Sequence, residues 1–530
     1  MQELTTMSET KSPFSALRAY IWPIHSFELR KFLPLLLMAF FIGFNYNILR
    51  NMKDALLVTA EASGAEVLPF IKVWGILPGA FLITFIYSRL NNRLSRDRVF
   101  YAMITIFLSS FAVFTFLLYP MHEHLHLHGF ANYLQALLPP GCKGLIAMFR
   151  YWSFSGFYIM GELWSSTILS MLFWGFANEV TLLGEAKRFY GLIAVGLNIA
   201  AIVAGQTAVF LTGPFLHNHF QFKDNPWEQS LILLTIAVLI SGLCIMGIYR
   251  YLTKRVLDNA QSGSSTPREK IRMSMRENFS YLARSKYLVY IAIVVLAYNL
   301  VINLIEVIWK DQVKMLYPSP NDYTSYMSQI TTITGLISLV TSLFISGQMI
   351  RRFGWTVSAA VTPIILLLTS IGFFTFFFGR ESLSSVVASV GTSPLVLVVF
   401  FGSAQNCLCR AAKFTLFDGT KEMAFIPLSM ESKLKGKAAI DGVGSRLGKS
   451  GGSLIHQGLL MTFSTISAST GYVAAILLGV IVMWLLAIKA LGKQFSLFSD
   501  AFATPPTQAA EPTSSEPKEV IPEPVTLSTP

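Results

Sequence analysis

Long apolar runs recur along this chain at lengths that match the thickness of a lipid bilayer. A membrane-spanning helix needs about 20 predominantly apolar residues. Runs of that kind fall at 32–49, 67–88, 98–120, 145–173, 189–212, 229–249, 286–308, 326–347, 355–379, 394–416, 437–463 and 468–489. The pattern therefore predicts an all-α membrane protein with twelve transmembrane helices. Gly, Pro or a charged residue interrupts several runs, so a count that differs by one pair of helices is the alternative.

Composition supports the membrane assignment. The chain has 530 residues, of which 53% are hydrophobic and only 13% charged, whereas soluble proteins carry about 25% charged residues. The four cysteines are too few and too scattered for a disulfide framework or a zinc site. The first 20 residues lack the apolar core of a secretory signal. We expect a disordered tail over 491–530, which is rich in Pro, Ser and Glu.

Lys and Arg are distributed unevenly between the loops. They concentrate at both termini and in alternate loops, including 89–98, 187–188, 250–286 and 351–352. The positive-inside rule places such loops in the cytoplasm, so both termini are predicted to be cytoplasmic.

The two halves of the chain have related patterns. Basic residues follow the second and the eighth run (Arg93 and Arg352), and Lys-Asp pairs end the first and the seventh (Lys53-Asp54 and Lys310-Asp311). A duplicated six-helix unit is the layout of major-facilitator-type transporters. We therefore expect an N-terminal segment 1–31, six-helix halves at 32–249 and 286–490, and a basic linker at 250–285. Chance matching of basic loops is the alternative.

Charged residues inside the predicted spans mark a candidate site, because each costs about 2.5–3.5 kcal/mol at a bilayer centre and usually faces a cavity. Most are cations, which favours a polyanionic ligand. They are Lys53, Lys72, Arg150, Glu162, Glu306, Lys310, Arg410, Lys413, Lys437, Asp441, Arg446 and Lys449.

Spacing groups some of these charges. Glu306 and Lys310 are four residues apart and can pair on one helix face when the site is empty. Arg446 and Lys449 are three apart in a glycine-rich run, where small residues let a helix or a ligand approach closely. The alternative for Lys53, Lys72, Lys310 and Lys437 is that each lies near a span end and only extends its amine to the interface.

The sequence Gly448-Lys449-Ser450 resembles the end of a phosphate-binding P-loop. A P-loop requires Gly five residues before the Gly-Lys pair, after a buried strand, but Val443 occupies that position and no strand precedes it. The run is therefore interpreted as a membrane helix with basic side chains, and ATP hydrolysis is not supported.

Alternating histidines at 122–128 lie in the loop after the third span. A lone His-rich tract is a weak metal signal, so an external polar loop is preferred, and no metal or cofactor is expected.

Several long motifs resemble the ATP/ADP translocase family of chlamydiae, rickettsiae and plastids. They are NMKDALLV (51–58), GAEVLPFIKVWGILP (64–78), ELWSSTILSMLFWGFANEVT (162–181), EAKRFYGL (185–192), NLIEVIWKDQV (303–313), FTLFDGTKEMAFIPL (414–428) and GKAAIDGVGSRLGKSGG (436–452). The resemblance covers residues 14–495 and implies a twelve-helix carrier of nucleotides. It also implies that Lys53, Glu162, Glu306 and Lys449 act in transport.

Asn51-Met52 and Gly442 depart from the pattern of classical ATP/ADP exchangers, and NLVINLIEVIWKDQV (299–313) and KAAIDGVGSRLGKSGGS (437–453) resemble the chlamydial branch that moves several nucleoside triphosphates. We therefore expect a nucleoside triphosphate exchanger that works by alternating access. A proton-coupled net importer, a strict ATP/ADP exchanger and a carrier of another organic phosphate are the alternatives.

Roles can be assigned to the candidate residues on this hypothesis. Phosphates would bind Lys53, Lys449 and Arg446, with help from Lys310 and Lys413, while Glu162 and Glu306 pair with these cations in the empty state. Candidate base contacts are Tyr158, Asn178, Asn299 and Asn303. We expect a monomer in the cytoplasmic membrane of an intracellular bacterium, surrounded by lipid, with nucleotide as its partner and no nucleic acid.

Overall fold

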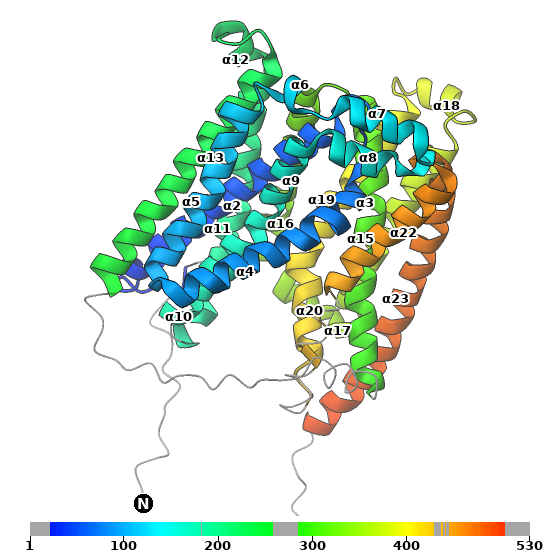
Figure 1. Cartoon of the computed structure of the whole chain (residues 1–530). Coiled ribbons are helices and arrows are strands. Elements are labelled where there is room, and N and C mark those ends of the chain that lie inside the picture. The colour runs from blue at the N-terminus through cyan, green and yellow to red at the C-terminus, as the bar shows by residue number, and fades with distance from the viewer. Residues whose placement is uncertain are drawn as a thin grey trace, which may run out of the picture.

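The structure, a computed structural model, describes residues 22–181, 183–257, 285–428, 436–437, 440 and 445–503. These residues form helices and connecting turns, with no strand among them. The helices run roughly side by side in one tall bundle (Figure 1), which confirms the all-α fold.

The first half of the chain forms one group of helices. Its elements are α2 (Leu29–Val58), α3 (Val67–Phe70), η1 (Ile71–Ile76), α4 (Leu77–Arg93), α5 (Arg96–Val113), η2 (Phe114–Leu118), α9 (Trp152–Trp164), η4 (Ser165–Phe173), α10 (Trp174–Val180), α11 (Leu183–Thr212), α13 (Pro226–Tyr251) and η5 (Leu252–Leu257).

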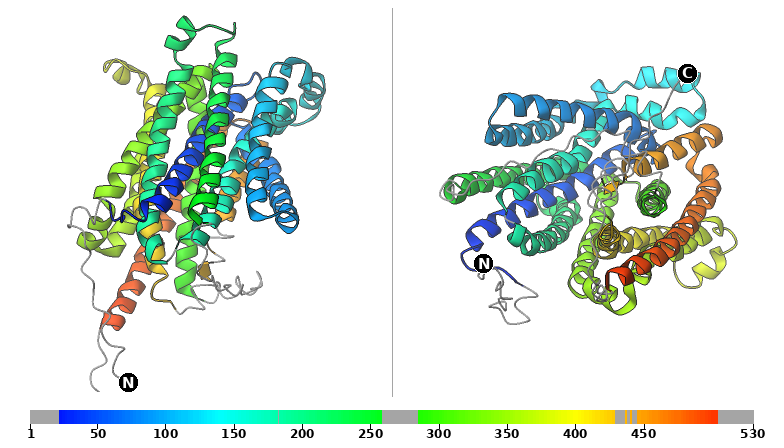
Figure 2. Two further views of the ribbon diagram at one scale, coloured as in Figure 1. Left: turned by 90° about the vertical axis from the view of Figure 1, so that its left-hand side faces the viewer. Right: turned by 90° about the horizontal axis from the view of Figure 1, so that it is seen from below.

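The second half forms a neighbouring group, as the view from below shows (Figure 2). Its elements are α15 (Lys286–Leu316), α16 (Pro320–Phe344), α17 (Ser346–Phe378), α19 (Pro394–Ala412), η7 (Lys413–Phe417), α20 (Asp418–Ala424), α22 (Ser445–Phe463) and α23 (Ile466–Ala503).

Short helices gather at the upper end of the bundle in Figure 1. They are α6 (His122–Leu125), α7 (His128–Leu137), η3 (Pro140–Cys142), α8 (Lys143–Arg150), α12 (Pro214–His219) and α18 (Ser384–Ala388). The last turns of α13 and the first of α15 lie at the opposite, lower end (Figure 1).

Local sequence sets where several helices begin. Asn225 and Ser285 each accept a hydrogen bond from a backbone N–H in the first turn of α13 and α15, respectively. Ser393 does the same for α19. Such caps satisfy amide groups that otherwise have no partner inside the helix. Proline is the first residue of α13 and α19, where its missing N–H is not needed.

Ten helices in the described part of the chain are long and apolar enough to cross a membrane. They correspond to ten of the twelve predicted spans. The two others, 145–173 and 437–463, carry charges. A turn at Tyr151 separates α8 from α9 in the first, and the second is described as a continuous helix only from Ser445. Twelve spans therefore stay a prediction.

The linker and tail boundaries differ from expectation in two places. α13 and η5 continue to Leu257, inside the expected linker. α23 continues to Ala503, which lies inside the segment expected to be disordered. Residues 491–503 contain apolar side chains and no proline, so the helix does not end until shortly before Pro505. Residues 258–284 and 504–530, which include most of the basic linker and of the tail, are outside the described residues.

Small residues bring the two halves into close contact. A side chain on Gly205 of α11 would meet Thr332 Oγ1 and Ser328 O of α16 at 2.2 and 2.6 Å. On the other side of the same contact, a Cβ added to Gly335 of α16 would stand 2.9 Å from the backbone oxygen of Asn198. Glycine at these positions lets helix backbones pack closely, as in many membrane interfaces.

Candidate functional site

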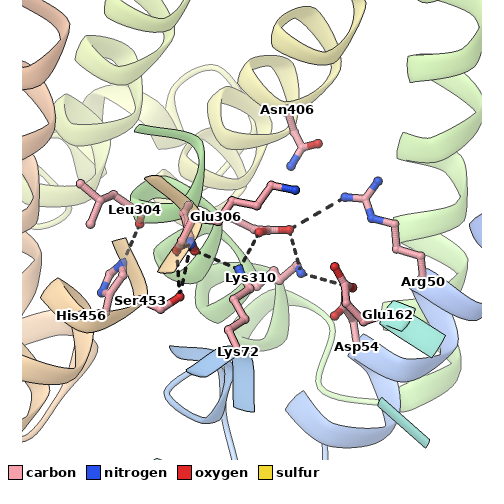
Figure 3. Close-up of polar contacts among 12 residues, drawn as sticks. Arg50, Asp54, Lys72, Glu162, Leu304, Glu306, Lys310, Asn406, Ser453 and His456 are labelled. Carbon is pink, nitrogen blue, oxygen red and sulfur yellow. Dashed lines mark hydrogen bonds and ion pairs between the residues drawn. The ribbon is translucent and has the colours of Figure 1, made fainter. Parts of the chain in front are cut away.

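A chain of ion pairs crosses the contact between the two halves (Figure 3). We call it the central cluster, and it consists of Arg50, Lys53, Asp54, Lys72, Glu162, Glu306 and Lys310. The first five residues come from the N-terminal half and the last two from α15. Four cations thus meet three carboxylates where the halves join.

Lys53 of α2 has three partners within the N-terminal half. Its ammonium group lies 3.1 Å from Asp54 Oδ1, 3.1 Å from Glu162 Oε2 and 3.7 Å from the centre of the Tyr158 ring. Lys53 is buried. The alternative that it extends to the membrane interface is therefore wrong, since its charge is neutralised inside the protein.

Lys310 connects the two halves. Its ammonium group lies 2.8 Å from Asp54 Oδ2 and 3.0 Å from Glu306 Oε1. The second contact is the predicted pair of residues four apart on one helix, which the structure confirms. The side chains of Lys310 and Asp54 are 2% and 0% exposed, so this pair is sealed from solvent.

Lys72 makes a second connection between the halves, from η1 to α15. Its ammonium group donates to Asn303 Oδ1 at 2.9 Å and lies 3.0 Å from Glu306 Oε2. Arg50 approaches Glu306 at 3.9 Å. The side chains of Lys72 and Glu306 are 19% and 15% exposed, so this pair is more accessible than the pair of Lys310 and Asp54.

The glycine-rich run of α22 lies against α15. A side chain on Gly448 would stand 2.8 Å from Asn299 Cβ, and one on Gly452 would stand 3.1 Å from Asn303 Cβ. Asn303 donates hydrogen bonds to the backbone oxygen of Lys449 and to Ser453 Oγ. The small residues therefore admit a neighbouring helix, which was one of the two uses expected of them.

Lys449 projects from this helix with an exposed side chain. It lies near enough to Glu162 of the opposite half to interact with it electrostatically. Gly448, Lys449 and Ser450 are all inside the helix Ser445–Phe463, and the described residues contain no strand before it. The interpretation of this run as a helix rather than a P-loop is confirmed.

A narrow recess opens beside Glu306 between α15, α17 and α19. Polar residues of α19 line it, among them Gln405, Asn406 and Arg410. Asn406 lies on the same side of the central cluster as Arg50 and Glu306 (Figure 3).

Other predicted residues lie outside the central cluster. Asn178 is exposed at the end of α10, where it accepts a hydrogen bond from the Tyr190 hydroxyl. Lys413 lies at the start of η7, 3.6 Å from Asp418. The side chain of Arg446 and all of Asp441 are outside the described part of the chain.

The three other candidate base contacts each already have a contact within the protein. Tyr158 lies under Lys53, and Asn303 contacts Lys72 and α22. The amide of Asn299 donates to the backbone oxygen of Val295 within α15.

Sequence reasoning assigned no role to Arg50 and gave Asp54 none beyond its motif. Their spacing was the available signal. Arg50 and Asp54 are four residues apart near the end of the first span, and residues four apart lie on the same face of a helix. The pairing of Lys72 with a residue of the other half had no sequence signal.

The histidine loop does not gather a metal site. No group of three or more His, Cys, Asp or Glu residues in the described part of the chain is arranged to hold a metal ion. His126 Nε2 instead lies 2.8 Å from Ser153 Oγ, and the His122 ring contacts the backbone oxygen of Tyr119.

Solved structures share this arrangement of helices. A bacterial homologue of the iron transporter ferroportin, in an inward-facing state, matches with a TM-score of 0.56 and 14% identity over 88% of this chain and all of that one. A D-xylose-proton symporter matches with a TM-score of 0.53 and 14% identity, over 87% of this chain and 97% of the other. The fold is that of major-facilitator-type transporters.

Sequence comparison defines the family. The model of the TLC ATP/ADP transporter family matches residues 7–495. ADP,ATP carrier proteins 2 and 1 of Chlamydia pneumoniae are 46% and 47% identical to this chain, over 96% and 92% of it and 96% of each carrier. The chloroplastic ADP,ATP carrier protein 2 of Arabidopsis thaliana is 40% identical over 90% of this chain and 76% of that protein. The chain therefore belongs to the TLC ATP/ADP transporter family, which confirms the resemblance drawn from the motifs.

Proposed function

We propose that this chain carries nucleotides, ATP and other ribonucleoside triphosphates, across a membrane by counter-exchange through alternating access. The single observation that carries the proposal is the cluster of four cations and three carboxylates between the two halves. A triphosphate chain is a polyanion that complements a surplus of positive charge at such a site. The relatives named as ADP,ATP carriers support the same substrate class.

Lys53, Lys449 and Arg446 are the proposed phosphate ligands, with help from Lys310 and Lys413. Glu162 and Glu306 are the proposed partners of these cations in the empty carrier. The contacts of Lys53 with Glu162, 3.1 Å, and of Lys310 with Glu306, 3.0 Å, support this pairing. Binding of phosphate would then exchange carboxylate oxygens for phosphate oxygens around the same ammonium groups.

Exchange follows from the cost of charge inside a membrane. If the carboxylates separate from the cations while the carrier reorients without a ligand, charges of both signs lose their partners in a medium of low dielectric constant. A bound nucleotide keeps the cations neutralised during that step. An empty carrier would therefore reorient slowly, and uptake would depend on nucleotide at the opposite side.

Transport measurements distinguish the candidate mechanisms. The purified chain is reconstituted in vesicles, and uptake of each labelled nucleotide is measured with and without internal nucleotide and with a protonophore. Exchange requires internal nucleotide and is insensitive to the protonophore. Uptake into empty vesicles that the protonophore abolishes would establish a proton-coupled importer, and uptake confined to ATP and ADP would establish a strict exchanger.

The carrier is proposed to transport nucleotides without hydrolysing them. It is proposed to act as a monomer in the cytoplasmic membrane of an intracellular bacterium, with both termini in the cytoplasm and lipid around the bundle. Release of inorganic phosphate from ATP by the purified chain would contradict the first point. Labelling of cysteines introduced near each terminus, with a reagent that does not cross the membrane, tests the orientation.

A further inference from the structure

We propose that Lys72 is a phosphate ligand of the carrier and that the Glu306 carboxylate forms an ion pair with Lys72 when no nucleotide is bound. The inference rests on the proposed function, because it takes the entering anion to be the phosphate chain of a nucleotide. It gives Lys72, a charged candidate to which the sequence assigned no role, a function in substrate binding, against the alternative of an interface contact near a span end.

Lys72 contacts the other half of the molecule. From η1 its ammonium group reaches two residues of α15, Asn303 Oδ1 at 2.9 Å and Glu306 Oε2 at 3.0 Å. Figure 3 shows this side chain pointing at Glu306, which also faces Arg50 and Lys310. Any movement that separates η1 from α15 must break both contacts.

Lys72 and Glu306 differ in the charged contacts that each retains when their ion pair separates. Glu306 keeps Lys310 of its own helix at 3.0 Å, so its charge stays compensated. Lys72 loses both Asn303 and Glu306, and Glu306 is the one carboxylate within ion-pair distance of it in the described part of the chain. Separation is therefore costly for Lys72 unless another anion replaces Glu306.

Access is also unequal within the central cluster. Lys72 and Glu306 are 19% and 15% exposed, whereas Lys310 and Asp54 are 2% and 0% exposed. A phosphate group entering the space between the halves can reach Lys72 without dismantling the sealed pair. Arg50, whose side chain is 13% exposed beside Glu306, is accessible to a similar degree.

These two asymmetries imply that nucleotide binding removes one connection between the halves. Without nucleotide, the bridge from Lys72 to Glu306 holds η1 against α15. With nucleotide, phosphate oxygens take the place of the Glu306 carboxylate on Lys72, and Glu306 remains with Lys310. The same exchange of partners supplies binding energy and loosens the contact between η1 and α15, while the pair of Lys310 and Asp54 still joins the halves.

Binding of ATP and AMP to the purified full chain tests this proposal by isothermal titration. Lys72→Gln keeps a hydrogen-bonding group but removes the charge, and we expect it to weaken ATP binding by about tenfold, since a charge-assisted contact is lost. AMP has fewer phosphates and should be affected less. Lys72→Arg should keep most of the affinity for ATP. Lys223→Gln, which removes a cation paired with Glu228 outside the cluster, is the matched control and should bind ATP as the unaltered chain does.

Glu306→Gln provides a test with the opposite sign. If the Glu306 carboxylate competes with phosphate for Lys72, its removal strengthens ATP binding, whereas loss of a purely structural contact would weaken it. Unchanged ATP affinity in Lys72→Gln, equal weakening of ATP and AMP, or weaker ATP binding by Glu306→Gln would each overturn the proposal. Failure of the unaltered chain to exchange ATP in vesicles would instead contradict the proposed function, so the two failures are distinguishable.

Discussion

Lys310 and Asp54 form a buried ion pair with 2.8 Å between Nζ and Oδ2, although they belong to different halves of the chain. Each comes from a Lys-Asp pair at a corresponding position of the two related halves. The pair joins α15 to α2 at the point where the central cluster is most deeply buried. This pair is sealed from solvent, whereas the pair of Lys72 and Glu306 is partly exposed.

Asp54→Asn tests the importance of this connection for stability. The substitution leaves the four cations of the cluster with two carboxylates, and removing one partner of a buried pair costs roughly 3–5 kcal/mol. We expect a clear fall in the thermal unfolding temperature of the purified chain, which ATP partly reverses because phosphate restores negative charge. Asp224→Asn removes an exposed carboxylate and is the control. Equal unfolding temperatures for the two variants would contradict the prediction.

Lys449→Ala tests the proposed phosphate site on α22. Because Lys449 is exposed and lies across from Glu162, its removal should reduce labelled ATP uptake by about tenfold or more with little effect on stability. Uptake into vesicles loaded with ATP measures the first effect, and thermal unfolding measures the second. Lys223→Ala should transport normally. Full uptake by Lys449→Ala would remove this residue from the site.

Gly448→Val tests the close contact of α22 with α15. The added Cβ would stand 2.8 Å from Asn299 Cβ and 3.1 Å from the backbone oxygen of Leu296, so the helices must separate. Overpacking of this kind costs typically about 1–3 kcal/mol, and we expect a lower unfolding temperature and slower exchange. On the same helix, a side chain at Gly458 meets nothing within 4 Å, so Gly458→Val should be tolerated. Identical behaviour of the two variants would be evidence against tight packing at Gly448.

Acid should weaken the packing of the histidine loop. Burial, with smaller contributions from His122 and His128, lowers the pKa of His126 from 6.5 to about 4. Between these values the unfolded chain binds a proton that the folded chain does not, so stability falls as the pH drops from 6.5 toward 4. Thermal unfolding at pH 7.5 and pH 5 should show a loss that is smaller by roughly 1–2 kcal/mol in His126→Gln. Replacement of the exposed His219 by Gln is the control, and an equal loss in both variants would refute the effect.

Much of the fold was predictable because it depends on apolar length. Runs of about 20 apolar residues can bury their backbone polar groups in lipid only as helices, and ten predicted spans have the expected length and composition. The predicted spans that contain Glu162 and Lys449 are not among these ten long, apolar helices of the described residues. Their charged and small residues, which dilute the apolar signal, are the ones that contribute to the site.

The site was predictable where charge inside a membrane is the signal and unpredictable where pairing depends on the tertiary fold. Lys53 and the pair of Glu306 and Lys310 stood out for their position in apolar runs. Lys72 was a candidate on the same ground but received no role, because a lysine near a span end has the same pattern whether it contacts lipid headgroups or a carboxylate on another helix. Asn178 was named only for its amide, which is too common a group to rank, and it lies in a contact with Tyr190 instead.

The duplicated Lys-Asp pairs no longer have equivalent partners. Lys310 binds Asp54 of the other half, whereas Lys53 binds Glu162 and Asp54 of its own half, and Asp311 accepts a hydrogen bond from Gln312. Made alone, the second half would keep the contact of Lys310 with Glu306 but lose the Asp54 carboxylate, which comes from the first half. Two copies of one half would not reproduce this contact, so we expect fragments split in the linker to be most stable as a heterologous pair.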